Sequence, residues 1–246
     1  LAQSNPAIEH FVCAVYDGDT LLPRAYLQRM LFRGERLDSF RPNRWLAQKL
    51  YDIIVRPIRW RVLSLGSIFT TGDNGLVFSK ELSQEAKEEV YGYFLYQLQN
   101  GLIPYDGLLI KDVYMATDSW MIDSLRKRGF YMTPSEPDMI LENVTRFSTM
   151  EKYAAALRAK YRTKYNQVAE RSKDLRVDDY SNWGEAPTET MFPLYVNIMS
   201  AVDFYIQLMS PAYFQIDGNS SSSLPKLRTY SVDGQVIGWI SWFESA

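Results

Sequence analysis

The sequence predicts a mixed α/β protein, and three observations lead to that class. Short apolar runs rich in β-branched and aromatic residues alternate with segments whose apolar residues recur at helical spacing. Asp-Gly turn signals follow two of the apolar runs, which indicates hairpins. An order of strands and helices typical of a mixed sheet occurs twice within 246 residues, a length that is sufficient for two small domains.

The first half opens with a predicted hairpin and a helix. Residues 11–16 and 26–32 are apolar runs, and Asp17-Gly18-Asp19 supplies the turn. A helix is expected from Asn43, as its cap, to Val55. Its apolar positions at helical spacing are Leu46, Leu50, Ile53 and Ile54.

Alternating strands and helices complete the first predicted domain. A long connection, residues 67–78, separates a strand expected at 61–66 from the helix that follows it. Two helices are expected in this part of the chain, and Gly101 and Gly129 mark their ends. The expected elements are a strand at 61–66, a helix at 83–100, a strand at 108–114, a helix at 118–128 and a closing strand at 138–143. The first domain is therefore predicted to span residues 1–145.

The second half, residues 146–246, repeats part of this order. Ser148 and Glu151 form a capping-box pattern before a helix expected to continue to Lys173. The apolar stripe of that helix is Tyr153, Leu157, Tyr161, Tyr165 and Val168. A strand at 175–180, a helix at 189–204, a flexible loop at 218–223 and a hairpin of 227–230 with 235–242 follow. The second domain is expected to be incomplete at Ala246.

Composition restricts the classes of function. The chain carries 27 Lys and Arg against 29 Asp and Glu, and 46% of its residues are hydrophobic, which excludes disorder. A pI of about 5.6 lacks the global basic charge typical of nucleic-acid-binding proteins. No apolar stretch approaches the roughly 20 residues that span a bilayer, so no membrane partner and a cytoplasmic location are expected.

Cysteine and histidine are too scarce for several kinds of site. Cys13 lies in an apolar run and is interpreted as a buried small hydrophobe, and a single cysteine indicates a reducing compartment. His10 is the one histidine of the chain. A histidine-rich metal site is therefore excluded, no metal is expected, and a Ser-His-Asp triad has little room.

The two hairpins suggest an internal duplication, and the order of elements resembles a known fold. Three stretches carry the resemblance: Val232 to Trp239, Leu125 to Phe130, and the helix within Phe147 to Arg171 that contains Lys160-Tyr161-Arg162. They resemble the GNAT fold of acyl-CoA N-acyltransferases and, in particular, its bacterial Fem-like branch with two tandem domains. The resemblance implies an acyl- or aminoacyl-transferase with acyl-CoA as a cofactor, a small-molecule acyl donor and an amine acceptor as partners, and transfer RNA as a further partner.

The sequence departs from that family at two positions. The glycine-rich loop with which such enzymes hold the pyrophosphate of coenzyme A corresponds here to residues 67–78, a longer loop in which the glycine spacing differs. Leu125 stands where the family places an acid tyrosine. In the second half, the sequence stops at the hairpin, before any such loop.

Two groups of residues are candidates for an active site. Thr71, Gly72, Asn74 and Gly75 are the candidates for binding a cofactor through backbone amides; alternatively, they form a solvent-exposed loop with left-handed turns. Lys111 and Asp112 are consecutive charges on an apolar strand and are expected to point to opposite faces. In the family arrangement Asp112 is a base or substrate anchor; the alternative is an ion pair or a strand end. Glu142 is a further candidate of this kind.

The helix expected at 151–173 carries a third group of candidates. Its basic residues fall in two rows, one of Arg158 and Arg162 and the other of Lys160, Lys164 and Arg171. They form either a solvated face or a patch that contacts the phosphates of coenzyme A or RNA. The leading functional expectation is therefore N-acyl transfer, and the alternative is a non-catalytic GNAT-like binding module that presents this helix to RNA.

Overall fold

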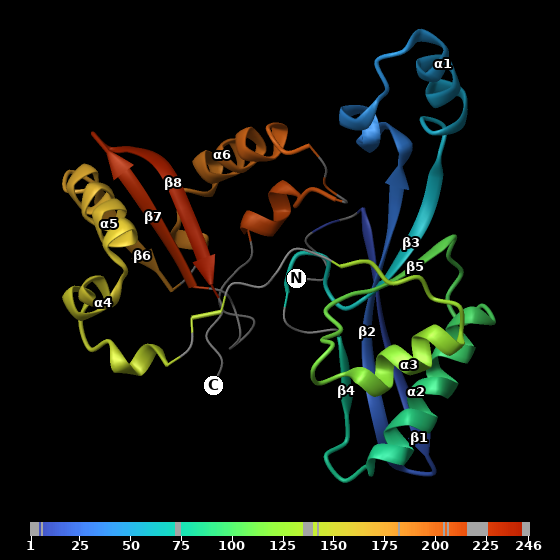
Figure 1. Ribbon diagram of the computed structural model, residues 1–246. Coiled ribbons are helices and arrows are strands. Elements are labelled where there is room, and N and C mark those ends of the chain that lie inside the picture. The colour runs from blue at the N-terminus through green and yellow to red at the C-terminus, as the bar shows by residue number, and fades with distance from the viewer. Residues whose placement is uncertain are drawn as a thin grey trace. The chain divides into compact units, whose positions relative to one another are not determined.

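The protein has a mixed α/β fold that divides into two compact units (Figure 1). Unit 1 consists of Leu1–Asp138 and Val202–Ser210, and unit 2 of Met139–Ala201 and Pro211–Ala246. In the described part of the chain, no helix is both long enough and apolar enough to cross a bilayer. The computed structural model describes residues 5, 7–71, 75–134, 140–141, 143–181, 183–203, 205, 207–215 and 226–242.

A mixed sheet forms the centre of unit 1. Its main path is β1 (Ile8–Asp17), β2 (Thr20–Arg33), β3 (Arg59–Leu65) and β5 (Gly107–Ile110), in that order. The pairs β1–β2 and β2–β3 are antiparallel, whereas β3 and β5 are parallel. A short strand, β4 (Leu76–Phe78), also pairs with β2. The expectation that residues 67–78 form only a connection is therefore wrong for the last three residues.

The predicted first hairpin is confirmed, with an irregularity in its register. Asp17 pairs with Thr20, so Gly18 and Asp19 form the turn, and Gly18 takes a φ of +57°. A bulge between Ala14 and Tyr16 then shifts the pairing by one residue. From that point the two strands pair with the same offset to the end of the ladder, and His10 lies opposite Gln28.

Two helices cover one face of the sheet and create the core of unit 1. On α2 (Gln84–Gln99), Phe94 and Leu98 pack against the buried side chains of Leu27, Leu63 and Leu65. The hydroxyl of Ser83 caps this helix by accepting a hydrogen bond from the backbone N–H of Ala86 at 3.2 Å. On α3 (Ser119–Lys127), Met121 and Leu125 pack against Tyr91 and Leu95 of α2. Both helices confirm the sequence prediction.

An arm extends from one end of the sheet. The pairs from Leu31↔Arg61 to Arg33↔Arg59 lie beyond the last pairs that β2 and β3 make with β1 and β5. The arm carries a 3₁₀ helix, η1 (Gly34–Phe40), and α1 (Trp45–Ile54) at its far end (Figure 1). The predicted helix is confirmed, but the residue before its first turn is Arg44 rather than Asn43.

A distant segment of the chain returns to unit 1 beside the arm. The side-chain amide of Asn5 donates to the carbonyl of Leu208 at 2.9 Å. Arg36 donates to Oε1 of Gln207 at 3.1 Å, and the hydroxyl of Ser39 donates to the carbonyl of Asp203. Residues 202–210 therefore belong to the first unit although they follow most of the second in sequence.

The predicted closing strand of the first domain is wrong where the structure describes it. Ile140, Leu141 and Asn143 lie in no strand, and the two aliphatic side chains are 75% and 56% exposed. Residues 138, 139 and 142 lie outside the described residues.

Unit 2 combines helices with a three-stranded antiparallel sheet of order β6-β7-β8. Its strands confirm the predictions at 175–180, 227–230 and 235–242. The predicted flexible loop at 218–223 lies outside the described residues. The elements are η2 (Val144–Arg146), α4 (Met150–Ala156), α5 (Ala159–Arg171), β6 (Arg176–Tyr180), η3 (Trp183–Glu185), α6 (Thr188–Ser200), η4 (Pro211–Gln215), β7 (Lys226–Val232) and β8 (Gln235–Trp242).

The core of unit 2 is aromatic and centres on Phe214. Its ring lies 5.5 Å from that of Trp239 on β8 and 5.7 Å from that of Phe192 on α6. The indole N–H of Trp239 donates to the carbonyl of Met191 at 3.2 Å, so the same contact satisfies a buried polar group. Met191 and Leu227 are fully buried beside this cluster.

The single long helix predicted for residues 148–173 is instead two helices. The chain leaves helical geometry at Leu157 and Arg158, where ψ is 144° and 148°. This break brings the rings of Tyr153 and Tyr165 to 6.3 Å, although twelve residues of straight helix would separate them by about 18 Å. The cap is also displaced by one residue, since the hydroxyl of Thr149, not Ser148, accepts from the N–H of Lys152.

The two hairpins differ at their turns. In the second hairpin Val232 pairs with Gln235, and Asp233 and Gly234 form the turn with φ values of +49° and +77°. In the first, the aspartate of the Asp-Gly pair is the last strand residue and Gly18 begins the turn. The shared dipeptide therefore occupies different turn positions, and the duplication stays a prediction.

We expect Phe214→Ala to destabilise unit 2 by about 3–5 kcal/mol, because the fully buried ring leaves a cavity among the aromatic side chains. Hydrogen–deuterium exchange at the β7 amides of the full chain measures this loss. Tyr161→Ala, which truncates a ring that is 55% exposed, is the matched control and should leave the exchange within about 0.5 kcal/mol of the wild type. Unchanged β7 protection in Phe214→Ala would contradict this account of the core.

Candidate functional site

The loop that connects β3 to β4 is hydrogen-bonded at both of its ends to one residue of β2, Tyr26. The N–H of Gly66 donates to the carbonyl of Tyr26 at 2.8 Å, and the N–H of Tyr26 donates to the carbonyl of Gly75 at 2.7 Å. A Cβ on Gly75 would lie 2.4 Å from the Cα of Gly66, and Gly75 has a φ of +72°. Glycine is therefore required where the two ends of the loop meet. Gly66 and Gly75 therefore meet at the two ends of the connection between β3 and β4.

The parallel pairing of β3 and β5 brings Lys111 to this loop. The two strands pair from Val62↔Gly107 to Leu65↔Ile110, so the residues that follow each strand lie at the same edge of the sheet. The ammonium group of Lys111 donates to the carbonyl of Thr70 at 2.5 Å. The structure therefore places the predicted Lys111 and Asp112 beside the loop that contains the predicted residues Thr71 and Gly75.

Lys111 and Asp112 form an ion pair just beyond the end of β5. Their side chains are only 17% and 12% exposed. The strand ends at Ile110, and Asp112 takes the left-handed conformation with a φ of +55°. The expectation that the two side chains point to opposite faces of a strand is wrong, because the left-handed residue turns the chain and directs them toward each other.

A chain of hydrogen bonds runs across the sheet to the same loop. Nδ1 of His10 lies 2.6 Å from the hydroxyl of Tyr26, and the amide of Gln28 donates to that hydroxyl at 2.9 Å. Oε1 of Gln28 accepts from the backbone N–H of Ile68 at 2.8 Å. Gln28 is almost fully buried, so these bonds fix both its orientation and the first residues of the loop.

His10, Gln28 and Ser64 lie side by side on three neighbouring strands, and with Tyr26 they form a polar row across the sheet. Two polar atoms of this row are buried and lack a partner among the described residues: Nε2 of His10 and the hydroxyl of Ser64. Gln28 pairs with Ser64 on one side and with His10 on the other, so the three side chains share one face of the sheet. A neutral imidazole that accepts the Tyr26 proton at Nδ1 carries its own proton at Nε2. Burial lowers the pKa of His10, which favours this neutral form at pH 7.

A shallow cavity of about 300 Å³ lies next to the loop. Val12, Tyr26, Thr70 and Gly75 contribute to its walls, and Arg24 is the one charged residue among those that line it. A cavity of this size lies at the lower end of the range for small-molecule sites. It adjoins the loop residue whose carbonyl accepts from Lys111.

The remaining predicted residues lie elsewhere or cannot be placed. Thr71 is exposed, and Gly72, Asn74 and Glu142 lie outside the described residues. The basic residues belong to unit 2 and are exposed on or next to α5: Arg158, Lys160, Arg162 and Lys164. No group of three or more His, Cys, Asp or Glu side chains in the described residues is arranged to hold a metal ion.

The residues that the sequence interpretation did not select are His10, Tyr26 and Gln28. The alternation of β2 was a signal for Tyr26 and Gln28, which are two residues apart and share a face. Cys13, in contrast, is half-buried beside the apolar core of the sheet. Burial raises the pKa of its thiol, in agreement with its interpretation as a small hydrophobe.

The fold and this site define the protein as a two-unit mixed α/β protein with a polar site at the carboxyl ends of a parallel strand pair. Comparisons with protein-family models, with curated proteins and with solved structures find no significant match to the chain.

We expect His10 to titrate below its ordinary pKa of about 6.5 in the folded protein, because burial penalises the imidazolium form. The unfolded chain then binds more protons between the two pKa values, so the free energy of unfolding falls as the pH drops through 6.5 toward the folded pKa. The stabilisation is fully present above pH 6.5. NMR of the imidazole is unambiguous, since the chain has one histidine.

His10→Gln is the variant that isolates this effect. Urea unfolding at pH 7, 6 and 5 should show a smaller loss of stability in the variant than in the wild type. An imidazole midpoint at or above 6.5 in the folded wild type would show that burial does not control this group.

Proposed function

We propose that unit 1 transfers an acyl or aminoacyl group from a thioester or ester donor to an amine acceptor at the carboxyl ends of β3 and β5. The observation that carries this proposal is the placement of the Lys111–Asp112 pair beside the glycine-closed loop. The order of elements supports it: a hairpin, an antiparallel strand, a helix, a parallel strand and a helix occur in the order of the GNAT-like arrangement that the sequence resembles. The additional elements are η1 and α1, between the hairpin and β3, and β4, between β3 and α2.

Asp112 is proposed as the base for the acceptor. An alkyl amine is largely protonated at pH 7 and must lose a proton before its lone pair attacks the donor carbonyl. The Asp112 carboxylate accepts that proton directly or through a water molecule. Lys111 is a positioning residue, since it holds the carboxylate by an ion pair and is itself held by the carbonyl of Thr70.

The loop is proposed to stabilise the donor and the oxyanion. Attack by the amine forms a bond to the carbonyl carbon and moves the π electrons of the carbonyl to the oxygen. Collapse re-forms the carbonyl and expels the thiolate or alkoxide with the electrons of its own bond to carbon. The proton left on the attacking nitrogen passes to the leaving group or to water. Backbone N–H groups are suited to both the oxyanion and a pyrophosphate. The amides of Ile68 and Phe69 are bonded to side chains. The proposal keeps Thr71, Gly72, Asn74 and Gly75, the residues that the sequence suggests, for this role.

Leu125 supports a mechanism without the acid tyrosine of the resembled family. Its side chain is 4% exposed and packs between α2 and α3, where it serves the core of unit 1. A thiolate leaving group requires little protonation near neutral pH, because an ordinary thiol has a pKa of about 8.5. The missing tyrosine is thus compatible with thioester donors in particular.

We expect acetyl-coenzyme A or a longer acyl-coenzyme A to raise the thermal midpoint of the full chain, because a ligand that binds only the folded state stabilises it. Asp112→Asn should keep that shift and lower amine-dependent thiol release by about 100-fold or more. Asp123→Asn, whose carboxylate is 65% exposed on α3, is the matched control and should retain wild-type turnover. The absence of a shift with every thioester would reject coenzyme A dependence.

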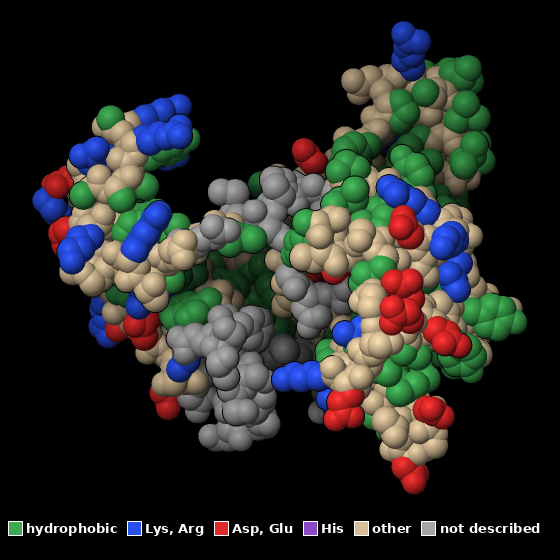
Figure 2. Space-filling view, turned by 60° about the horizontal axis from the view of Figure 1, so that its bottom comes forward, with side chains coloured by type: hydrophobic (Ala, Val, Ile, Leu, Met, Phe, Trp, Pro, Cys, Tyr) green, Lys and Arg blue, Asp and Glu red, His purple; other side chains and the backbone are tan. Residues whose placement is uncertain are grey.

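A second candidate function is RNA binding by unit 2 without catalysis. The segment 158–173 carries six Lys and Arg residues and one acidic residue, and nearly all side chains of α5 are exposed. Figure 2 shows Lys and Arg side chains gathered over the part of unit 2 that carries α4 and α5. Exposed cations at this density suit a phosphate backbone.

We expect this candidate, if correct, to show transfer RNA binding that weakens steeply with salt. Filter binding of the full chain between 50 and 300 mM KCl measures the slope, and each lost phosphate contact should reduce it by about one. Lys160→Gln with Lys164→Gln should therefore reduce the slope by about two. The control pair, Lys80→Gln with Lys127→Gln in unit 1, should leave it unchanged. Equal slopes in all three proteins would reject α5 as the RNA-binding element.

A further inference from the structure

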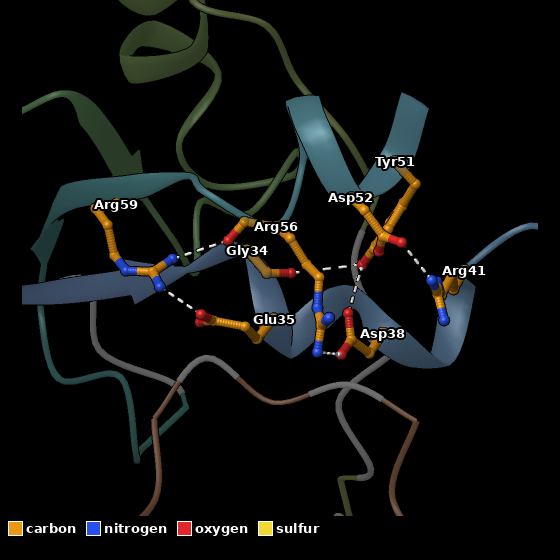
Figure 3. A network of polar contacts seen from close by, with 8 residues as sticks. All are labelled: Gly34, Glu35, Asp38, Arg41, Tyr51, Asp52, Arg56 and Arg59. Atoms are coloured by element: carbon orange, nitrogen blue, oxygen red, sulfur yellow. Dashed lines mark hydrogen bonds and ion pairs between the residues drawn. The ribbon is translucent and has the colours of Figure 1, made fainter. Parts of the chain in front are cut away.

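The helix α1 attaches to the arm through its polar side. Tyr51 is the buried residue of this helix, and its hydroxyl lies 3.5 Å from the carbonyl of Gly34 and 3.3 Å from Oδ1 of Asp38 (Figure 3). A Cβ on Gly34 would lie 1.8 Å from the carbonyl oxygen of Val55, so glycine is required where the chain that follows the helix crosses η1. The arm is therefore closed by backbone contact and by a tyrosine.

Three ion pairs surround this attachment. Arg41 pairs with Asp52, Arg56 with Asp38, and Arg59 with Glu35 (Figure 3). These are the three carboxylates of residues 33–59, which also contain seven Lys and Arg. The segment has a net charge of +4, although the whole chain has −2. The acidic groups of the arm are thus already neutralised by arginines of the arm itself.

The apolar side of α1 faces outward. Helices of soluble proteins normally turn their apolar stripe toward the core, and here that stripe is exposed. At 100° per residue the exposed side chains occupy one half of the helix circumference. Trp45, Leu46, Leu50, Ile53 and Ile54 are 67%, 64%, 52%, 71% and 63% exposed. Figure 2 shows hydrophobic side chains gathered along one side of this arm.

Two cationic side chains lie next to this apolar surface, one at its edge and one among the apolar residues. Arg44 directly precedes the helix and is exposed. Lys49 lies on the same half of the helix as the apolar residues, and its ammonium group is 4.2 Å from the centre of the Trp45 ring. A tryptophan beside a lysine at the border of an aliphatic surface is suited to a boundary between charged groups and hydrocarbon.

We propose that the arm binds an anionic lipid surface, with α1 lying in the plane of the interface and its apolar half among the acyl chains. The net positive charge of residues 33–59 distinguishes this partner from the other possible partners of the surface. A second copy of the arm would bring another net positive segment against the first, and a nucleic acid would offer phosphates but no cover for Leu46 or Ile53. An anionic bilayer supplies both partners, since it has hydrocarbon below a negatively charged surface.

The length of α1 fits a helix that lies on a membrane. Ten residues of helix extend about 15 Å, half of the hydrocarbon thickness of a bilayer. The expectation of no membrane partner considered only segments long enough to span a bilayer. The inference is independent of the proposed acyl transfer, because α1 and the candidate site share no residue.

Vesicle sedimentation with the full chain tests the proposal. We expect binding to vesicles of phosphatidylcholine with 30% phosphatidylglycerol, and at least tenfold weaker binding to phosphatidylcholine alone. Leu46→Gln with Ile53→Gln should lower the partition coefficient at least tenfold while circular dichroism and the thermal midpoint stay unchanged, because both side chains are exposed. Arg44→Gln with Lys49→Gln should reduce the preference for anionic vesicles.

Two control variants separate the arm from other surfaces. Leu102→Gln with Ile198→Gln replaces aliphatic side chains that are 52% and 67% exposed outside the arm, and it should bind as the wild type does. Lys160→Gln with Lys164→Gln, which removes charge from α5, should also retain binding. The proposal is overturned if the wild type does not sediment with anionic vesicles, if it binds both vesicle types equally, or if Leu46→Gln with Ile53→Gln binds unchanged. Self-association that this double variant abolishes, without vesicle binding, would assign the surface to a second copy instead.

Discussion

Pairing along the single strand β2 is the constraint on which unit 1 depends. Its fourteen residues form ladders with β1, β3 and β4, and no other strand of the unit pairs with three partners in the described structure. One face of β2 supplies Leu27 to the apolar core, whereas the other supplies Tyr26 and Gln28 to the polar row. The arm begins at the carboxyl end of β2, where η1 follows Arg33. Core, candidate site and arm therefore share one register, and a slip of one residue in β2 would alter all three.

The candidate site depends on two left-handed residues, Gly75 directly before β4 and Asp112 just after β5. Gly75 closes the loop against Gly66, and Asp112 turns the chain so that its carboxylate meets Lys111. Glycine adopts such a conformation without penalty, whereas aspartate adopts it at a small cost. Strained backbone of this kind is often found where side chains must be held in a fixed position, and here it holds a buried charge pair beside the carbonyl of Thr70.

The sequence was sufficient for most of the elements, although not for β4 or for the division between α4 and α5, and it was insufficient for their orientation. Apolar periodicity located α1, α2, the hairpins and the strands of unit 2, because these signals are local. Counting back from the Asp17–Thr20 pair would place His10 opposite Leu27, and the bulge at Ala14 places it opposite Gln28. The stripe of α1 showed an amphipathic helix but not which half faces the protein, since that depends on Tyr51 and Gly34. The break at Leu157 brings the rings of Tyr153 and Tyr165 together, and no proline or glycine lies at that point of the sequence to predict it.

The return of residues 202–210 to unit 1 has a consequence for how this chain is made. Asn5, Arg36 and Ser39 each contact that short segment, which is synthesised only after most of unit 2. A nascent chain that has emerged as far as the predicted boundary at residue 145 therefore still lacks part of its first unit. The two units are therefore not consecutive in sequence, because the last segment of unit 1 lies between two segments of unit 2. Cutting the gene at residue 145 would separate the arm from residues 202–210, which contact it.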